Sequence, residues 1–232
     1  MKKKIIFAFS IAFGFVELIM LVLILTLKGQ AGTILSFCSI AISFLYSMLF
    51  LSKNISNTST SLALLFATVS DIFLVLVSPR IQTVAMTTFS VTQIMLAIRL
   101  FCNANKKQKI WQCILRAVFV IIVLIVTVIV LKGKVDYLSV ISMFYYSNLI
   151  FNVIVAFTQI KKSKLLAIGL LLFLCCDTLV GISTCAPYIS IPKTNILYVM
   201  ATSSFNWIWL FYLPSQVLIA YSLLEINKKT FS

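Results

Sequence analysis

The chain has 232 residues, of which 62% are hydrophobic and 10% are charged, and it contains no histidine. A sequence this apolar cannot cover a soluble domain with polar groups, so the composition indicates an integral membrane protein. The net charge of +14 would fit a nucleic-acid-binding protein if the basic residues shared a soluble face. Here they stand in short clusters between apolar runs, so nucleic acid is not an expected partner.

Eight apolar runs, each of about 18 residues or more, are long enough to cross a bilayer. They cover residues 5–27, 33–51, 60–78, 84–101, 113–131, 136–158, 165–183 and about 200–224. The first run follows a basic start, as in a signal peptide, but it is too long and lacks a small-residue cleavage site. The sequence therefore predicts a single transmembrane domain, residues 1–232, built as an all-α bundle of eight helices. The last helix has the least defined start, because Pro192 and Lys193 precede a weakly polar stretch.

The basic residues agree with eight crossings, which place both termini on one side of the membrane. That side receives fourteen of the nineteen basic residues: Lys2, Lys3, Lys4, Lys53, Arg99, Lys106, Lys107, Lys109, Arg116, Lys161, Lys162, Lys164, Lys228 and Lys229. The other side receives Lys28, Arg80, Lys132, Lys134 and Lys193. Because an excess of Lys and Arg marks cytoplasmic loops, we expect both termini to be cytoplasmic. The short basic start and compact loops fit a bacterial cytoplasmic membrane.

Polar side chains interrupt the middle of several spans. At ~1.5 Å per residue from the cytoplasmic ends, Glu17, Asp71 and Asp177 lie roughly 16 to 18 Å into a core of about 30 Å. Gln93 and Gln216 reach a similar depth from their own helix ends. Contact with lipid would be costly for all of them, so we expect most to face a shared interior.

Three spans carry polar or small residues at helical spacing. The sixth carries Ser142, Tyr145, Asn148, Asn152 and Gln159. Asn148 and Asn152 are candidates for binding or orienting a substrate, although polar stripes also join helices to one another. In the seventh span, Gly169 and Gly181 share the face of Asp177 and leave room for close helix packing or for a ligand. In the eighth, Tyr212 and Gln216 are aligned, whereas the fifth carries only Thr127 and is expected to be peripheral.

The acids limit the chemistry that this chain can perform. No cationic residue is expected at their depth, and two such carboxyls can divide their work, one holding a proton and the other a negative charge. The pair could serve as general acid and charge stabiliser, or as a proton or cation site. The lack of histidine excludes histidine–zinc sites and Ser-His catalysis, and nothing in the sequence indicates a cofactor.

Four stretches resemble the motifs of a known family. They are LLFATVSDIFLVL (64–76), FSVTQIMLAIRLF (89–101), LLLFLCCDTLVGI (170–182) and FYLPSQVLIAYSL (211–223). In these motifs, in length and in the number of spans, the chain resembles the YhhN-like membrane proteins, whose members include lysoplasmalogenases. It departs from their pattern at Gln93, where members commonly have histidine, and at residues 46–51, which lack the usual Lys-Pro element.

The resemblance implies hydrolysis of the vinyl ether bond of a lysoplasmalogen to a fatty aldehyde and a glycerophospho-alcohol, with a membrane lipid or lysolipid as partner. Asp71 and Asp177 would be the catalytic pair, by analogy with the paired carboxylates of glycosidases. Gln93 and Gln216 would orient water or the ether oxygen, and Tyr212 would support them. The sequence carries no signal for an oligomeric state.

Two other functions fit the same residues. A small transporter would use Glu17, Asp71 and Asp177 for proton or cation coupling. A non-catalytic lipid-binding relative of the enzymes would use the bundle interior alone. Asp71→Asn separates the three, because it would abolish aldehyde release in the enzyme and ion-dependent flux in the transporter, and neither in the lipid binder.

Overall fold

Helices account for all the regular structure in the described part of the chain. The computed structural model describes residues 2–27, 29–77, 81–131, 135–185 and 192–231. These contain nine α-helices and one short π-helix, without a strand. Eight of the described helices are long and apolar enough to cross a membrane, as the sequence predicts. Lys28, Arg80, Lys132 and Lys134, expected on the side away from the termini, lie outside the described residues.

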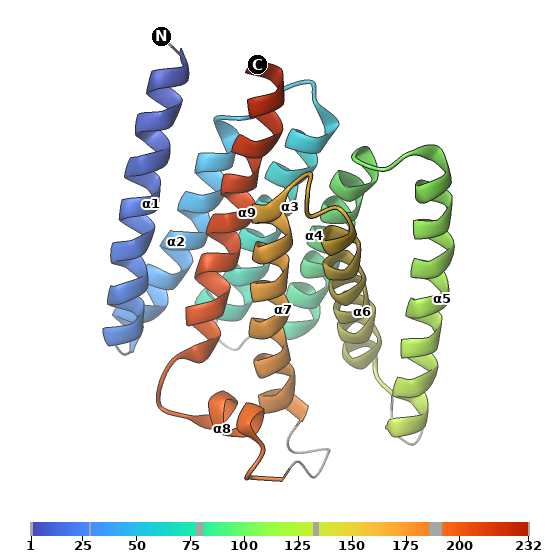
Figure 1. Ribbon diagram of the computed structural model, residues 1–232. Helices are drawn as coiled ribbons and strands as arrows, with labels where there is room; N and C mark the ends of the chain where they lie inside the picture. The colour runs from blue at the N-terminus through green and yellow to red at the C-terminus, as the bar shows by residue number, and fades with distance from the viewer. Residues whose placement is uncertain (1, 28, 78–80, 132–134, 186–191, 232) are drawn as a thin grey trace.

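The helices follow one another through short connections. They are α1 (Lys2–Thr26), α2 (Gln30–Met48), α3 (Ile55–Asp71), the π-helix η1 (Ile72–Leu76), α4 (Gln82–Cys102), α5 (Lys106–Val130), α6 (Tyr137–Thr158), α7 (Lys164–Cys185), α8 (Ile196–Thr202) and α9 (Trp207–Phe231). Both ends of the chain lie at the same end of the bundle, at the top of Figure 1. This agrees with an even number of crossings.

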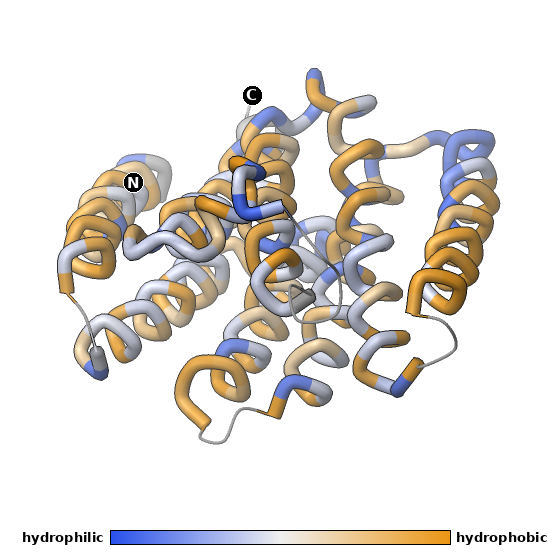
Figure 2. Tube along the Cα trace, turned by 90° about the horizontal axis from the view of Figure 1, so that it is seen from below, coloured by the Kyte–Doolittle hydropathy of each residue, from blue (hydrophilic) through white to orange (hydrophobic). Residues whose placement is uncertain are grey.

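Six helices form a closed ring. Going round it, α2 packs on α3, α3 on α4, α4 on α6, α6 on α7, α7 on α9, and α9 on α2. The remaining long helices lie outside the ring, with α1 against α2 and α9 and α5 against α6. Figure 2 shows these two helices at opposite edges, both mainly hydrophobic. Side chains that face the inside of the ring can therefore meet across it, while α1 and α5 have sides left for lipid.

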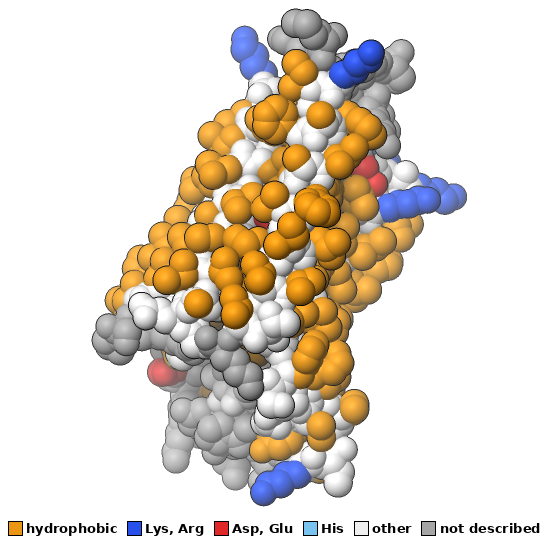
Figure 3. Space-filling view, turned by 90° about the vertical axis from the view of Figure 1, so that its left-hand side faces the viewer, with side chains coloured by type: hydrophobic (Ala, Val, Ile, Leu, Met, Phe, Trp, Pro, Cys, Tyr) orange, Lys and Arg blue, Asp and Glu red, His pale blue; other side chains and the backbone are white. Residues whose placement is uncertain are grey.

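The outer surface is apolar, as a membrane requires. On α1, Phe7 and Phe15 are 68% and 65% exposed, and on α5 Ile121 and Ile129 are 56% and 69% exposed. Figure 3 shows hydrophobic side chains over most of the face on the α1 side, with Lys and Arg mainly toward its ends. The prediction that the fifth span is peripheral is confirmed, because α6 is its main neighbour among the described helices.

The fifth span begins seven residues before the expected start at Cys113, at Lys106. Asn105 caps it, accepting a hydrogen bond from the backbone of Gln108, whose side chain bonds back to the backbone of Asn105. This capping box begins the helix inside a stretch that looks like a basic loop. As a result, Arg116 stands about 15 Å along the helix instead of near its start.

The last span also differs from the expected boundary. Met200 belongs to the short helix α8, which Asn195 caps, and Ser203 to Asn206 separate it from α9, which starts at Trp207. Arg99 is a further correction, because it was assigned to the basic membrane surface and is instead completely buried inside the bundle.

Arg99 joins several helices at the end of the bundle that holds the termini. Its guanidinium donates to Thr60 on α3, to the hydroxyl and carbonyl of Ser222 on α9, and to Ser163 just before α7. Ser163 in turn donates to Glu225 of α9 at 2.6 Å. A fully buried guanidinium with this many partners fixes how α3, α4, α7 and α9 pack between the site described next and the end of the bundle that holds the termini.

Candidate functional site

Asp71 is the last residue of α3 and lies inside the ring. Its side chain is 3% exposed and accepts a hydrogen bond of 2.8 Å from the hydroxyl of Tyr212 on α9. Directly after it the helix widens into η1, in which the amide of Val77 donates to the carbonyl of Ile72. Single π turns inside α-helices are common at functional sites, because the extra residue redirects the side chains around them.

Asp177 lies in α7 and has a similar partner. It accepts a short hydrogen bond from the hydroxyl of Tyr145 on α6. The side chain of Asp177 is partly exposed, in contrast to the buried Asp71. Each acid is thus held by a tyrosine from a neighbouring helix.

Asp71 and Asp177 lie near each other with their tyrosine partners. We call the two carboxyl residues the acid pair. The carboxyl groups lie close enough to interact electrostatically with each other and with the buried thiol of Cys176. Tyr212 interacts electrostatically with Asp177 as well as with Asp71, to which it donates its hydrogen bond. The structure therefore brings together the two residues that the family resemblance implied as the catalytic pair, although their role stays a prediction.

Aromatic rings enclose the acid pair. Phe89 of α4 lies 5.5 Å from Tyr145 and 6.1 Å from Phe173, and Phe173 lies 5.4 Å from Tyr212, measured between ring centroids. Phe89 and Phe173 are both buried. This row of rings fixes the orientation of both tyrosines and gives the cluster an apolar wall, which strengthens electrostatic interactions inside it.

The two glycines that flank Asp177 on α7 have different surroundings. A Cβ atom on Gly169 would lie 3.0 Å from the carbonyl oxygen of Ser215 and 3.2 Å from the amide nitrogen of Ile219, both in α9. A Cβ atom on Gly181 would meet nothing within 4 Å. Gly169 therefore serves close helix packing, whereas Gly181 is exposed and packs against no other described helix.

Gln93, Asn148 and Asn152 form a second polar group one turn further along α6. The amide nitrogen of Asn152 donates to the side chain and to the carbonyl of Gln93, each at 2.9 Å. The oxygens of Asn148 and Asn152 accept hydrogen bonds from Arg116 of α5, at 2.8 and 2.7 Å. The three predicted orienting residues therefore meet each other and Arg116, and they make no hydrogen bond to the acid pair.

Gln216 and Glu17, the remaining polar residues at this depth, have hydrogen-bond partners outside the acid pair. The amide of Gln216 donates to its neighbour Ser215 at 3.3 Å. Glu17 is 1% exposed and accepts hydrogen bonds from Ser39 and Ser43 of α2. Glu17, Asp71, Gln93 and Gln216 are all buried, as expected of residues that avoid lipid, but they divide between separate groups of hydrogen-bond partners.

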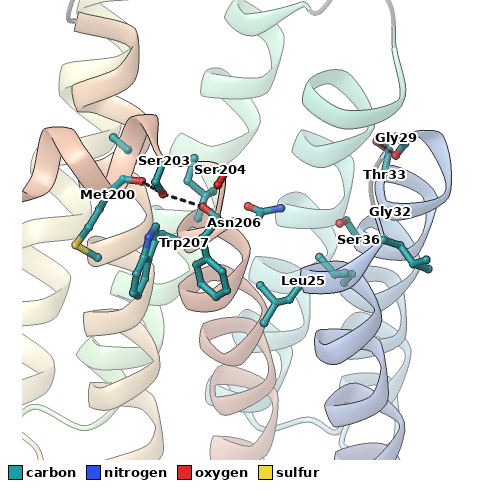
Figure 4. A pocket seen from close by; sticks show the side chains of 15 residues that line it. Leu25, Gly29, Gly32, Thr33, Ser36, Met200, Ser203, Ser204, Asn206 and Trp207 are labelled. Carbon is teal, nitrogen blue, oxygen red and sulfur yellow. Dashed lines mark hydrogen bonds between the residues drawn. The ribbon is translucent and has the colours of Figure 1, made fainter.

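One cavity of about 440 Å³ opens at the end of the bundle opposite the termini. It lies between the ends of α1 and α2 and the α8–α9 connection, and Figure 4 shows Ser36, Asn206 and Trp207 among the side chains around it. Ile208, also in its wall, precedes Tyr212 by one helical turn, or ~6 Å. The cavity wall therefore comes within one helical turn of Tyr212 on α9 and of Ser39, a partner of Glu17, on α2.

Sequence reasoning missed two residues of this region. Tyr145 belongs to the recognised polar stripe of the sixth span, but its partner Asp177 lies on another helix, and one sequence does not specify that pairing. Arg116 is expected at the membrane surface only if the fifth helix starts at Cys113, and the capping box of Asn105 and Gln108 starts it at Lys106 instead. That box is visible in the sequence and would have placed Arg116 inside the membrane.

Comparison with known proteins gives one family and no individual relative. The model of the YhhN family matches residues 31–223, which is most of the chain and includes all four motif stretches. The comparisons with curated proteins and with solved structures gave no match.

Proposed function

The chain belongs to the YhhN family, and on that premise we propose that it hydrolyses the vinyl ether bond of a lysoplasmalogen at the acid pair. The family includes lysoplasmalogenase-like members. The observation that carries the proposal is the meeting of Asp71 and Asp177 from separate helices, each held by a tyrosine hydroxyl. The reaction products are a fatty aldehyde and a glycerophospho-alcohol.

The chemistry requires an acid and a negative charge at the same place. One carboxyl donates its proton to the outer carbon of the vinyl ether, which turns the ether into an oxocarbenium ion. The other, as a carboxylate, stabilises that cation, and water then adds to the carbon beside the oxygen and returns a proton to the pair. The hemiacetal breaks its carbon–oxygen bond, and the alcohol oxygen leaves with a proton. One water is consumed and the enzyme returns to its starting state.

Tyr145 and Tyr212 position the two carboxyls for these steps. A hydroxyl that donates to one carboxyl oxygen leaves the other oxygen free to face the substrate. Water is expected to enter from the cavity whose wall includes Ile208, one helical turn before Tyr212 on α9. The aromatic wall keeps bulk water away from the carboxyls, so that a single admitted water adds to the oxocarbenium ion.

The experiment measures aldehyde release from a lysoplasmalogen by the purified protein in detergent. Asp71→Asn and Asp177→Asn are each expected to reduce the rate about a hundredfold or more. Glu17→Gln is the matched control, because it changes an equally buried acid of the same bundle that lies outside the acid pair. Equal losses in all three variants, or none in the two aspartate variants, would overturn the proposal.

Glu17 supports a second candidate, a proton- or cation-coupled transporter. Glu17 is a buried carboxylate that accepts hydrogen bonds from two serine hydroxyls of α2, and a third serine of α2, Ser36, lies in the cavity wall. Carboxylate and hydroxyl oxygens are the ligand types of a small-cation or proton site. In proteoliposomes, that function predicts pH- or ion-dependent flux that Glu17→Gln abolishes. The same variant keeps its aldehyde release if the enzyme proposal is correct, so it separates the two functions. A protein that binds lysolipid but shows neither activity would be a non-catalytic relative.

A further inference from the structure

Arg116 is a cation in the apolar middle of a lipid-facing helix. Between Lys109 and Lys132, α5 and its end carry no other charged residue. Arg116 stands about 15 Å along α5, on the side toward α6, and its side chain is partly exposed. A charge at this depth is costly unless it has a partner, so a residue of this kind marks a functional site.

No acid of the chain neutralises Arg116. The five acidic side chains have other hydrogen-bond partners: Glu17 with Ser39 and Ser43, Asp71 with Tyr212, Asp136 with Ser139, Asp177 with Tyr145, and Glu225 with Ser163. The partners of Arg116 are the neutral amides of Asn148 and Asn152. The positive charge is therefore held in place without being compensated.

The guanidinium is held as a binding group would be. Two amide oxygens fix its plane, and it lies over the ring of Phe151 at 4.7 Å from the centroid. Around it, three buried polar atoms have no hydrogen-bond partner: Nε of Arg116, Oε1 of Gln112 and Nε2 of Gln93. Gln93 is completely buried and reaches this group through Asn152. Such atoms in a native protein call for a missing polar partner.

The approach to Arg116 is basic. Lys109, Gln112 and Arg116 share one face of α5 by their spacing of three and four residues, and Lys106 and Lys107 stand in the first turn. Arginine binds phosphate with two parallel hydrogen bonds, and a basic helix start attracts anionic headgroups at the membrane surface. The chemistry of this face matches a phosphate that enters from the membrane surface and moves down along α5.

The distance between Arg116 and the acid pair also fits a lysophospholipid. On α6, Tyr145 precedes Asn148 by one turn and Asn152 by two, which separates the acid pair from the guanidinium by ~5 to 10 Å along the helix. In a lysoplasmalogen, the phosphate and the vinyl ether stand at the two ends of one glycerol backbone. A phosphate at Arg116 would therefore place the ether bond at the depth of Asp177, well below its usual level near the headgroups.

We propose that Arg116 binds the phosphate of a lysophospholipid between α5 and α6 and thereby draws its vinyl ether down to the acid pair. The second half of this inference rests on the proposed function. The phosphate site stands on its own observations, and it gives Asn148, Asn152 and Gln93 the task of holding the arginine.

The experiment measures equilibrium binding to the detergent-solubilised protein by intrinsic tryptophan fluorescence. The ligands are a 1-O-alkyl lysophosphatidylethanolamine, which has no bond that the enzyme could cleave, and the matching 1-O-alkylglycerol, which has no phosphate. Arg116→Gln is expected to weaken binding of the phospholipid about 10- to 100-fold and to leave the alkylglycerol unchanged. Arg116→Lys should fall between, because it keeps the charge and loses the planar fork. Lys53→Gln, an exposed lysine in the connection between α2 and α3, is the control and should bind both ligands like the parent.

Equal weakening for both ligands in Arg116→Gln would show a merely structural role and overturn the proposal, as would unchanged phospholipid binding. Inorganic phosphate is the third probe. Competition by millimolar phosphate against the lipid would assign the site to the free anion and overturn the lipid assignment. Because none of these ligands can be hydrolysed, the result is independent of aldehyde release. If release is also found, Arg116→Gln should raise KM for the lysoplasmalogen far more than for an alkenylglycerol.

Discussion

Gly169→Ala tests how closely α7 and α9 must approach to hold the acid pair. The new methyl group would lie 3.0 Å from the carbonyl oxygen of Ser215 and 3.2 Å from the amide nitrogen of Ile219, where ordinary contacts begin at 3.4 Å. Both are backbone atoms, so the helices themselves must separate. Overpacking of this kind costs about 1–3 kcal/mol, which corresponds to a Tm lower by roughly 2–12 °C for a chain of this size.

Gly181→Ala is the matched control, because its methyl group enters open space on the same helix. It should leave Tm unchanged or raise it slightly, since alanine favours a helix by about 0.5–1 kcal/mol over glycine. The assay is thermal unfolding in detergent, followed by intrinsic fluorescence, with aldehyde release measured below Tm. Gly169→Ala should also reduce the rate, because α7 carries Asp177 and α9 carries Tyr212. Equal Tm values for the two alanine variants would refute the packing argument.

Four further substitutions have expected outcomes. Arg99→Met should lower the free energy of unfolding by about 3–5 kcal/mol, because buried hydroxyl and carbonyl groups lose their donor. A loss below about 1 kcal/mol would show that the network is dispensable. Tyr145→Phe and Tyr212→Phe should each slow aldehyde release about tenfold or more without a comparable loss of Tm, since each removes one hydrogen bond to a reacting carboxyl. Hydrogen bonds from the hydroxyl and amide of Ser139 lower the pKa of Asp136, so its stabilising effect is present above pH ~4 and is lost as pH falls through the lower folded pKa. A Tm profile from pH 6 to 3 should therefore be flatter in Asp136→Asn, and identical profiles would contradict this.

The fold could be predicted from the sequence because the bilayer leaves few alternatives. A run of apolar residues must become a spanning helix, so the number of crossings follows from hydropathy alone. The boundaries were wrong where polar residues continue a helix, as at Lys106, or where a polar stretch separates two helices, as at Ser203. A capping asparagine marks the start of α5 at Asn105 and of the short helix α8 at Asn195.

The sequence predicts how far along its helix each site residue lies, but not which side chains contact one another. Helix rise gives each acid its level in the membrane, and Asp71 and Asp177 do meet. The same calculation put Glu17 and Gln93 at that level, yet each has its own partners. The rotation of each helix about its axis decides such contacts, and it depends on packing between helices that no single motif specifies.

The measurement that tests the central claim most directly is a double-mutant cycle on aldehyde release from a lysoplasmalogen. It compares the parent with Asp71→Asn, Asp177→Asn and the variant that carries both changes. Because the two carboxyls act in the same step, the double variant should lose about as much activity as the worse single variant, roughly a hundredfold or more. Losses that multiply, or a folded parent protein that releases no aldehyde, would contradict hydrolysis by a paired acid.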